Sequence, residues 1–298
     1  MTRPEIEAFL SICRHKNISK AAEALYISQS SLSTRLKMLE DHLGCPLLLR
    51  GKGKREITLT TQGQAFYDLA LQYQQIIEKM ETVGRGDMLD QLRISVINSV
   101  GNYLMPPVFR RFTEKYPHIQ LVIQDMEAEM ACSSIIRGKT DIAFSTAKVQ
   151  TDQIIATPFL DDPMVVLCAA DSDYPDQVDL DMLSIKNEIY VKWCVEHAYW
   201  HSVTFGGDAI PPVDLAVMGQ IPLFLSGRNK WTLAPKSVAD RLLADGQLLR
   251  ACTPNFQVPF RTVYILRRRD NAETNTIHYF LDTLQEVLLA SNTKGLLL

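Results

Sequence analysis

Five polar side chains of one short segment are spaced so that they can hydrogen-bond and make charge contacts, the first four of them in its opening turns. They are Gln29, Ser30, Ser33, Thr34 and Lys37. Leucines recur on the other side of the same segment, at Leu32, Leu36, Leu39 and Leu43. At about 100° per residue, this spacing gives a helix with a narrow apolar stripe. Short polar groups in the first turns of such a helix can reach base edges and phosphates in a DNA major groove.

The stretch over residues 18–44 is predicted to form two short helices joined by a tight turn. Ser19 is expected to cap the first helix and Ser28 the second, because a hydroxyl can accept a hydrogen bond from a free first-turn N–H. The small side chains of Ala21 and Ala22 would let the second helix cross closely. An ordinary helical hairpin with a solvated polar face is the alternative interpretation at this point.

A basic loop follows the second helix and favours the DNA-binding interpretation. Gly44-Cys45-Pro46 stops the helix, and an alternating, strand-like segment runs over residues 56–60. Between them lies a glycine-rich loop with four cations, Arg50, Lys52, Lys54 and Arg55. A basic hairpin directly after a helix-turn-helix is a wing, and its cations are placed to contact backbone phosphates.

The charge of the chain is divided unevenly along its length. The net charge of the 298 residues is −3, which by itself argues against a nucleic-acid partner. Residues 1–60, however, hold ten Lys and Arg against six Asp and Glu, a balance of +4 that leaves −7 for the remainder. A basic head would meet DNA, whereas an acidic body would stay away from it.

A long helix without proline is predicted from Thr61 to about Met88. Its apolar residues alternate at spacings of three and four, at Phe66, Leu69, Tyr73, Ile76, Met80 and Val83. This heptad pattern is typical of two helices packing side by side, so we expect it to pair two subunits. Packing on the chain's own body is the alternative. Two heads related by a two-fold axis would read a palindromic site, and residues 84–87 would supply a hinge.

From Gln91 onward, strand-like and helix-like segments alternate, which indicates an α/β fold with a parallel, helix-covered sheet. Residues 98–101 are expected to form a turn after the first strand. The segment beginning at Asp162 is expected to cross into a second lobe, and residues 263–266 to cross back. A closing helix is predicted over residues 275–290.

Ligands of open α/β sheets bind at the carboxyl ends of strands, and this rule nominates the residues that follow the predicted strands. They are Asn98, Ser99 and Gly101 after the first strand, and Ser145 and Thr146 after the third. Lys192 and Trp193 could face the same cleft from the second lobe. Each of these residues has a structural alternative; Ser99, for example, could merely cap the next helix.

The head resembles the winged helix-turn-helix of LysR-type transcriptional regulators. The matching residues are Ala21-Ala22, Ile27-Ser28-Gln29-Ser30, Ser33, Leu39-Glu40, Leu43-Gly44, Pro46-Leu47, Arg50, Leu59-Thr60 and Gly63. Ser30 replaces the proline that usually follows the glutamine in this family, and Leu48 stands where phenylalanine is common. The remainder is similar to the family's effector domain in LRISVINSVGNYLMPP, in residues 138–144 and 157–167, and in Trp231–Pro235.

The resemblance implies an α/β chain with an α-rich winged head and an effector domain of two lobes, similar in fold to periplasmic binding proteins. The expected domains are the head (1–60), the linker helix and hinge (61–90) and the effector domain (91–298). Lobe I would comprise 91–162 and 267–298, and lobe II 163–266. The implied partners are double-stranded DNA with a palindromic operator, a small-molecule effector, and further copies in a homodimer or homotetramer. A residue at the place of Ser99 commonly contacts the effector in this family.

Other function classes find little support in the sequence. It contains no G-x-S-x-G, H-E-x-x-H, P-loop or G-x-G-x-x-G motif, so no enzymatic activity is expected. The six cysteines are scattered without zinc-type spacing, so neither a metal nor another cofactor is expected. No apolar run could span a membrane and no signal peptide is evident, which predicts a cytoplasmic protein. A cytoplasmic solute-binding or ligand-sensing protein without a DNA-binding role is the alternative.

Overall fold

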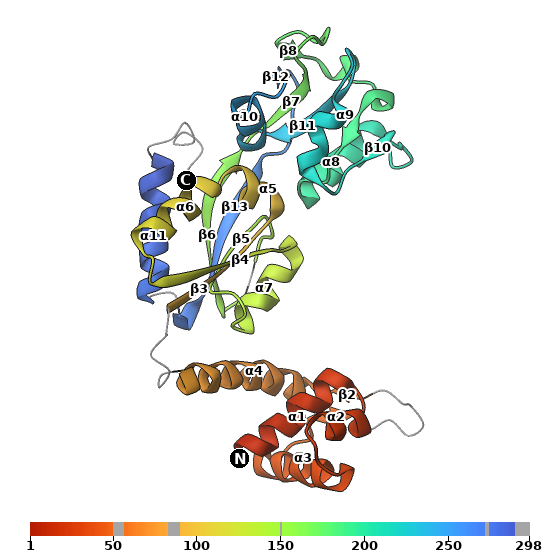
Figure 1. Ribbon diagram of the computed structural model, residues 1–298. Helices are drawn as coiled ribbons and strands as arrows, with labels where there is room; N and C mark the ends of the chain where they lie inside the picture. The colour runs from red at the N-terminus through yellow and green to blue at the C-terminus, as the bar shows by residue number, and fades with distance from the viewer. Residues whose placement is uncertain (50–56, 83–89, 150, 272–273, 290–298) are drawn as a thin grey trace. The chain divides into compact units, whose positions relative to one another are not determined.

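The computed structural model describes residues 1–49, 57–82, 90–149, 151–271 and 274–289 (Figure 1). The chain divides into two compact units, Met1–Met88 with Ile136–Gly138, and Leu89–Ile135 with Lys139–Leu298. None of the described helices is long and apolar enough to cross a membrane.

The first unit is a helical head with a small antiparallel hairpin. Its elements are α1 (Arg3–His15), α2 (Ile18–Ala24), α3 (Gln29–Leu43), β1 (Leu48–Leu49), β2 (Thr58–Leu59) and α4 (Thr61–Thr82). The core is built from Phe9 and Ile12 of α1, Ala21 and Ala22 of α2, and Leu32, Leu36 and Leu39 of α3, all of which are buried. Leu43, the last leucine of the predicted stripe, is exposed. The wing strands pair with Leu48 opposite Leu59.

Helix α2 begins before its predicted cap, so the expectation for Ser19 is wrong. The helix starts at Ile18, and the Asn17 side chain accepts a hydrogen bond from the backbone N–H of Lys20 at 3.1 Å. An asparagine oxygen satisfies the free first-turn N–H as well as a serine hydroxyl does. The expected cap on α3 is confirmed, since Ser28 Oγ accepts from the backbone N–H of Ser31 at 3.1 Å.

The second unit is built on a five-stranded sheet of order β4-β3-β5-β13-β6 and a four-stranded sheet of order β11-β7-β12-β8. The strands of the first sheet are β3 (Asp90–Val96), β4 (Ile119–Asp125), β5 (Ile142–Ser145), β6 (Ile154–Asp162) and β13 (Arg261–Arg268). Its helices are α5 (Asn98–Tyr103), α6 (Pro106–Lys115), α7 (Ala128–Ile136) and α11 (Asn275–Leu289), and a 3-10 turn at Arg269–Asn271 follows β13. Strands β3, β4 and β5 are parallel, as the alternating pattern predicted.

Helices α6 and α11 lie side by side along the five-stranded sheet (Figure 1). Leu92, Ile94 and Val96 of β3 point toward these helices and share a buried core with Phe112 and Phe280. Side chains alternate between the two faces of a strand, so Arg93 and Ser95 point to the other face. There the Ser95 hydroxyl is bonded to Thr140, which is bonded in turn to Ser134 of α7.

The second sheet carries the other lobe. Its strands are β7 (Met164–Ala169), β8 (Gln177–Val178), β11 (Trp231–Pro235) and β12 (Leu249–Pro254), and a short parallel pair is made by β9 (Ile189–Tyr190) and β10 (Val213–Asp214). Helices α8 (Val195–Phe205), α9 (Ile221–Phe224) and α10 (Lys236–Ala244) belong to this lobe, with 3-10 turns at Leu180–Met182, Ile185–Asn187 and Met218–Gln220. Trp231, Val166 and Val238 are fully buried in its core.

The boundaries of two predicted segments differ from the structure. Strand β13 pairs with β6 from Arg261 opposite Asp162 to Arg268 opposite Ile154, so residues 261–266, assigned to lobe II from the sequence, lie in the sheet of lobe I. The reason is that the returning strand pairs along the whole length of the outgoing one. Residues 98–101 are also not a turn, because the N–H groups of Val100 and Gly101 donate to the Ile97 carbonyl and begin α5.

Candidate DNA-binding and effector sites

The opening turns of α3 present polar side chains outward while the first three leucines of the stripe are buried. Leu32, Leu36 and Leu39 are at most 1 % exposed. Gln29, Ser30, Thr34 and Lys37 are exposed, and Ser33 is half-buried, as expected for a residue at the edge of the stripe. This burial fixes which face of the helix a partner can reach.

Hydrogen bonds hold several of these side chains in place. Gln29 Nε2 donates to Ser19 Oγ at 2.9 Å, the hydroxyls of Ser28 and Ser30 lie 2.9 Å apart, and Thr34 Oγ1 donates to the Ser30 carbonyl at 2.9 Å. Gln29 therefore links α3 to the start of α2. This bond uses the amide nitrogen, and the amide oxygen is a separate hydrogen-bond acceptor.

The base of the wing is anchored by Glu40, Leu47 and Gly63, which are among the residues that match the LysR-type head. Glu40 Oε1 accepts from the backbone N–H groups of Leu47 at 2.8 Å and Leu48 at 3.3 Å. The backbone also passes too close for a side chain at Gly63, where a Cβ atom would lie 2.0 Å from the Leu47 carbonyl oxygen. The predicted phosphate ligands Arg50, Lys52, Lys54 and Arg55 lie outside the described residues.

The apolar residues of α4 divide into an inward and an outward set. Phe66 packs edge-on against Phe9 with ring centroids 5.2 Å apart, and Tyr73 packs against the cluster of Ile6 and Leu10. In contrast, Leu69 is 61 %, Ile76 56 % and Met80 63 % exposed. Phe66 and Tyr73 therefore follow the alternative interpretation, packing on the chain's own head, whereas Leu69, Ile76 and Met80 do not. The sixth member, Val83, and the predicted hinge over residues 84–87 lie outside the described residues.

In the second unit, a buried ion pair joins the two strands that connect the lobes. Arg261 Nη2 donates to Asp162 Oδ2 at 2.7 Å, and both side chains are at most 1 % exposed. Arg261 Nη1 donates to Ser99 Oγ at 2.6 Å, which brings in helix α5 of lobe I. Asp162 also accepts from the backbone N–H and the hydroxyl of Ser237 at the start of α10 in lobe II.

Trp193 closes this junction from the lobe II side. The Arg261 guanidinium lies 5.8 Å from the centroid of its ring, and the indole N–H donates to the Leu233 carbonyl at 2.6 Å. Ser99 and Trp193, predicted from different parts of the sequence, thus meet through Arg261. Sequence reasoning missed Arg261, Asp162 and Ser237, because nothing local distinguishes them from other polar residues at strand and helix ends.

The remaining predicted effector residues fall into accessible and enclosed groups. Asn98 and Thr146 are half-buried and Lys192 is exposed, and Asn98 Nδ2 donates to Asp125 Oδ2 at 3.2 Å. Ser145 is fully buried; its hydroxyl donates to the Ala128 carbonyl at 3.3 Å and accepts from the Ala147 N–H. At Gly101, a Cβ atom would lie 2.9 Å from Val96 Cγ1, so this glycine permits close packing of α5 on β3.

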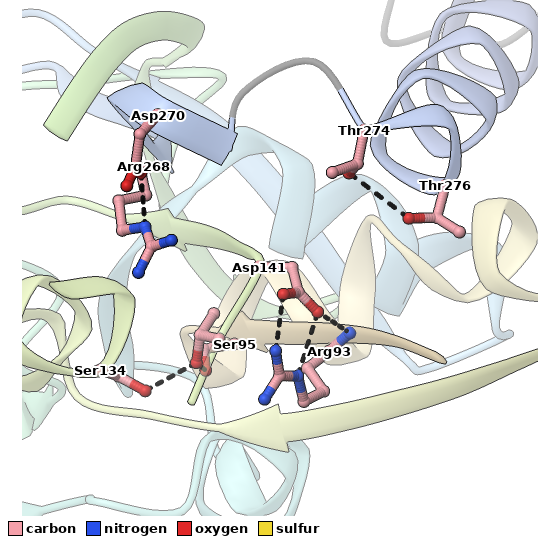
Figure 2. Close-up of polar contacts among 9 residues, drawn as sticks. Arg93, Ser95, Ser134, Asp141, Arg268, Asp270, Thr274 and Thr276 are labelled. Carbon is pink, nitrogen blue, oxygen red and sulfur yellow. Dashed lines mark hydrogen bonds and ion pairs between the residues drawn. The ribbon is translucent and has the colours of Figure 1, made fainter. Parts of the chain in front are cut away.

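A second polar cluster aligns the strands that carry these residues. Figure 2 shows the Arg93 side chain paired with Asp141, at 2.8 Å between Nη2 and Oδ1, with the Arg93 N–H bonded to the same carboxylate. Arg93 lies on β3 and Asp141 directly precedes β5, so the pair fixes the register in which Val96 lies opposite Phe144. Asn98 and Thr146 consequently leave the sheet at the same edge.

The comparisons with known proteins cover both units. Residues 5–64 match the family described as bacterial regulatory helix-turn-helix protein, lysR family, and residues 85–289 match the LysR substrate binding domain. The chain belongs to the LysR family. It is a DNA-binding transcriptional regulator with an effector-binding C-terminal domain, as the resemblance predicted.

Two relatives of this LysR-type regulator are themselves named as transcriptional regulators. The HTH-type transcriptional regulator CitR of Bacillus subtilis is 23% identical over 287 residues, which are 94% of this chain and 97% of CitR. The dual regulator OxyR of Escherichia coli is 24% identical over 187 residues, 62% of this chain and 61% of OxyR.

Solved structures show the same fold. A full-length OxyR variant from Pseudomonas aeruginosa has a TM-score of 0.64 at 23% identity, covering 96% of this chain and 95% of that one. Full-length CbnR in complex with its target DNA has a TM-score of 0.60 at 16% identity, covering 96% and 99%. The predicted fold class, a winged helix-turn-helix head with an α/β effector domain of two lobes, is confirmed.

Proposed function

We propose that the regulator reads its operator through Gln29, Ser30, Ser33 and Thr34 of α3. The observation that carries this proposal is that these polar groups are exposed or half-exposed at the opening of a helix whose opposite face is buried. Gln can pair with adenine through two hydrogen bonds, and serine and threonine hydroxyls can donate or accept at several base edges. Ser30, at the usual position of a proline, adds a hydroxyl to this surface.

Phosphate contacts come from Lys37 and from Arg50, Lys52, Lys54 and Arg55 of the wing. Lys37 is exposed on the outward face of α3, beyond the base-reading residues along the helix. Cations at these positions neutralise phosphates without reading sequence, so each contributes to binding on every duplex alike.

Two copies pair through the exposed face of α4, formed by Leu69, Ile76 and Met80. A two-fold axis between them places two recognition helices on a palindromic operator with half-sites about one helical turn apart. The domains keep the division expected above: head, 1–60; linker helix and hinge, 61–90; effector domain, 91–298. The lobe boundary, however, moves to Arg261.

A small-molecule effector binds where the lobes meet, near Asn98, Ser99, Thr146 and Lys192. Three of these are accessible, and Ser99 connects the site to the ion pair between the lobes through Arg261. Ser145, Gly101 and Trp193 shape the site from within the lobes. The regulator acts by binding rather than by catalysis, and it acts in the cytoplasm.

Selection from a random duplex pool tests the DNA-binding part. The full chain is expected to enrich a two-fold symmetric sequence, and the Gln29→Ala/Ser33→Ala double variant is expected to enrich none while remaining folded. An enriched sequence without symmetry would refute the paired-head arrangement. Enrichment of the same sequence by the double variant would refute the assignment of α3 as the reading helix.

A thermal-shift screen of the full chain against small carboxylates, amino acids and aromatic acids tests the effector site. A ligand at 100 times its Kd stabilises the folded state by about 2.7 kcal/mol, which raises the melting temperature measurably. The shift is expected to be lost in Asn98→Ala and Lys192→Ala and kept in Lys186→Ala, a lysine elsewhere in lobe II. A shift that survives both substitutions would place the effector elsewhere.

A further inference from the structure

Two cysteines face each other inside lobe II. Cys168 lies on β7 and Cys252 on the neighbouring antiparallel strand β12. The register places Cys168 opposite Arg250 and Cys252 opposite Val166, so the thiols are diagonal neighbours on one face of the sheet. Their Sγ atoms are 3.8 Å apart, and both thiols are free.

The surroundings of the two thiols are polar on one side. Ser172 Oγ lies 3.0 Å from Cys168 Sγ, and the Arg250 carbonyl oxygen lies 3.7 Å from it. Hydrogen bonds from Cys252 and Ser172, together with the charge of Arg250, lower the pKa of Cys168 well below that of a free thiol. The pKa of Cys252 is raised, because it donates to Cys168 and burial disfavours a second thiolate. One sulfur is therefore a nucleophile and the other keeps its proton.

The other cysteines provide a contrast. Burial raises the pKa of Cys13 to about 12 and also raises the pKa values of Cys132 and Cys194. Reactive cysteines are those held as thiolates by nearby donors and cations, whereas thiols in apolar surroundings are inert.

The two cysteines are buried, but the side chains packed against them are partly exposed to solvent. Cys168 and Cys252 are at most 2 % exposed, but Ser172 and Arg250, which lie against them, are half-buried side chains that reach solvent. Ser172 belongs to the loop after β7, whose residues Asp171 and Asp173 are exposed. Ser172 and Arg250 are therefore the side chains that separate Cys168 from solvent on this side.

We propose that Cys168 and Cys252 are a peroxide-oxidisable dithiol that closes to an intramolecular disulfide. The Cys168 thiolate attacks one peroxide oxygen, the O–O bond breaks, and the leaving oxygen departs as water or an alcohol after taking a proton. Cys168 is then a sulfenic acid. The Cys252 sulfur attacks it, the S–O bond breaks, and water leaves with the Cys252 proton. Two thiols are oxidised by two electrons and one peroxide is reduced.

Formation of the disulfide would link strand β7 covalently to strand β12. The sulfurs must approach from 3.8 Å to a bond length of about 2.05 Å, which draws β7 and β12 together. Strand β7 is the first of lobe II after the chain leaves lobe I, and β12 is the last before it returns. The disulfide therefore ties the strands by which the chain enters and leaves the lobe.

Stoichiometric hydrogen peroxide added to the reduced full chain tests the proposal, with peptide mass spectrometry after denaturing alkylation. The wild type is expected to yield one linked peptide pair, Cys168 with Cys252. Cys252→Ser should accumulate a sulfenic acid at Cys168 that dimedone traps. In Cys168→Ser, oxidation of Cys252 should be slower by roughly tenfold or more. Cys132→Ser, a half-buried control, should behave as the wild type.

The pH dependence of the oxidation rate distinguishes a thiolate with a lowered pKa from an ordinary thiol that is accessible to peroxide. Oxidation of Cys168 should reach half its maximal rate well below pH ~8.5, the pKa of a free cysteine. Cys168→Ala, checked for the native melting curve, guards against an effect of misfolding in the serine variant. Linkage of other cysteines, or equal oxidation of Cys252 with and without Cys168, would overturn the proposal.

Discussion

Arg261 and Asp162 are opposite charges that have both been removed from water. Burial of an ion is costly unless its partner and further hydrogen bonds compensate. Here Ser99 bonds to Arg261 and Ser237 bonds to Asp162, while Arg261 Nε has no partner among the described residues. The four residues come from two connecting strands and one helix of each lobe. The pair therefore fixes how the lobes join, next to the residues proposed to bind the effector.

Removal of one charge at this junction should destabilise the protein strongly. Asp162→Asn leaves the Arg261 guanidinium buried without a counter-ion, and the expected cost is about 3–5 kcal/mol in the free energy of unfolding. Urea denaturation monitored by circular dichroism measures it. Arg111→Gln breaks an exposed pair with Glu286 and should cost at most about 1 kcal/mol. Equal effects of the two substitutions would show that the buried pair has no special role.

His197 is buried, and its burial makes the stability of the folded state depend on pH. Both ring nitrogens lack a hydrogen-bond partner among the described residues, and the side chain is 2 % exposed. Burial, and to a smaller extent the charge of His201, lower the pKa of His197 from 6.5 to about 4. Because the folded state binds the proton more weakly than the unfolded state, stability is full above pH 6.5 and is lost as the pH falls toward 4.

Substitution of His197 by phenylalanine should remove this loss. Between about pH 7 and pH 4.5 the wild type is expected to lose about 2.5 kcal/mol of stability that His197→Phe keeps, beyond the changes common to both proteins. Parallel urea titrations at the two pH values give this difference. His118→Gln, at an exposed histidine, should follow the wild type. A constant gap between wild type and His197→Phe at both pH values would argue against a neutral, buried imidazole.

For single residues, the sequence predicts which side chains lie near the site better than it predicts their hydrogen-bond and ion-pair partners. Its position after a predicted strand marks Ser99 as a candidate, and Ser99 does lie at the junction of the lobes. Its partner Arg261 is 162 positions away in the chain, and Asp162 is 99 positions from Arg261. No local pattern encodes such pairs, because they depend on the antiparallel pairing of β6 with β13 and on the position of α5 beside them.

Helices α3 and α4 show how far periodicity determines an element. Leu32, Leu36 and Leu39 identify the buried face of α3 correctly, since one helix packed on one core has only one apolar side, whereas Leu43 at the helix end is exposed. The heptads of α4 were less informative, because Phe66 and Tyr73 pack on the head while Leu69 and Ile76 do not. A spacing of three and four describes any apolar side of a helix, and it does not distinguish a neighbour in the same chain from a second subunit.

Charges on the exposed side of α4 should separate the subunits. Leu69→Asp with Ile76→Asp would bring two carboxylates into the proposed contact, and the dimer is expected to dissociate to a lower mass by light scattering. Gln64→Asp adds a carboxylate to a different exposed side of the same helix and should leave the mass unchanged. If the double variant remains a dimer, the α4 contact is not what pairs the heads.

The elements that the sequence described least well are those that depend on neighbours. Strand β6 was not predicted, and its pairing with β13 includes a register shift at Val263/Tyr264 that disturbs a regular alternation. Helix α5 was predicted as a turn because it is only six residues long and contains Gly101. Long amphipathic helices and the parallel strands β3, β4 and β5, by contrast, follow directly from periodicity.

On the scale of the whole molecule, charge and chemistry are divided between the two units. The head, residues 1–60, carries a balance of +4 and the rest of the chain −7. A basic head binds duplexes through phosphate neutralisation, whereas specificity depends on the few side chains that reach base edges. Affinity and sequence discrimination should therefore respond to different substitutions.

The central claim is that α3 reads the operator. It is tested most directly by the ratio of two affinities of the full chain, one for its selected operator and one for a scrambled duplex of equal length, measured at one salt concentration. The Gln29→Ala/Ser33→Ala variant should bring this ratio close to one while keeping the weaker, nonspecific affinity. Lys37→Ala should weaken both affinities alike and leave the ratio unchanged. An undiminished ratio in the double variant would contradict the assignment of α3 as the element that reads the operator.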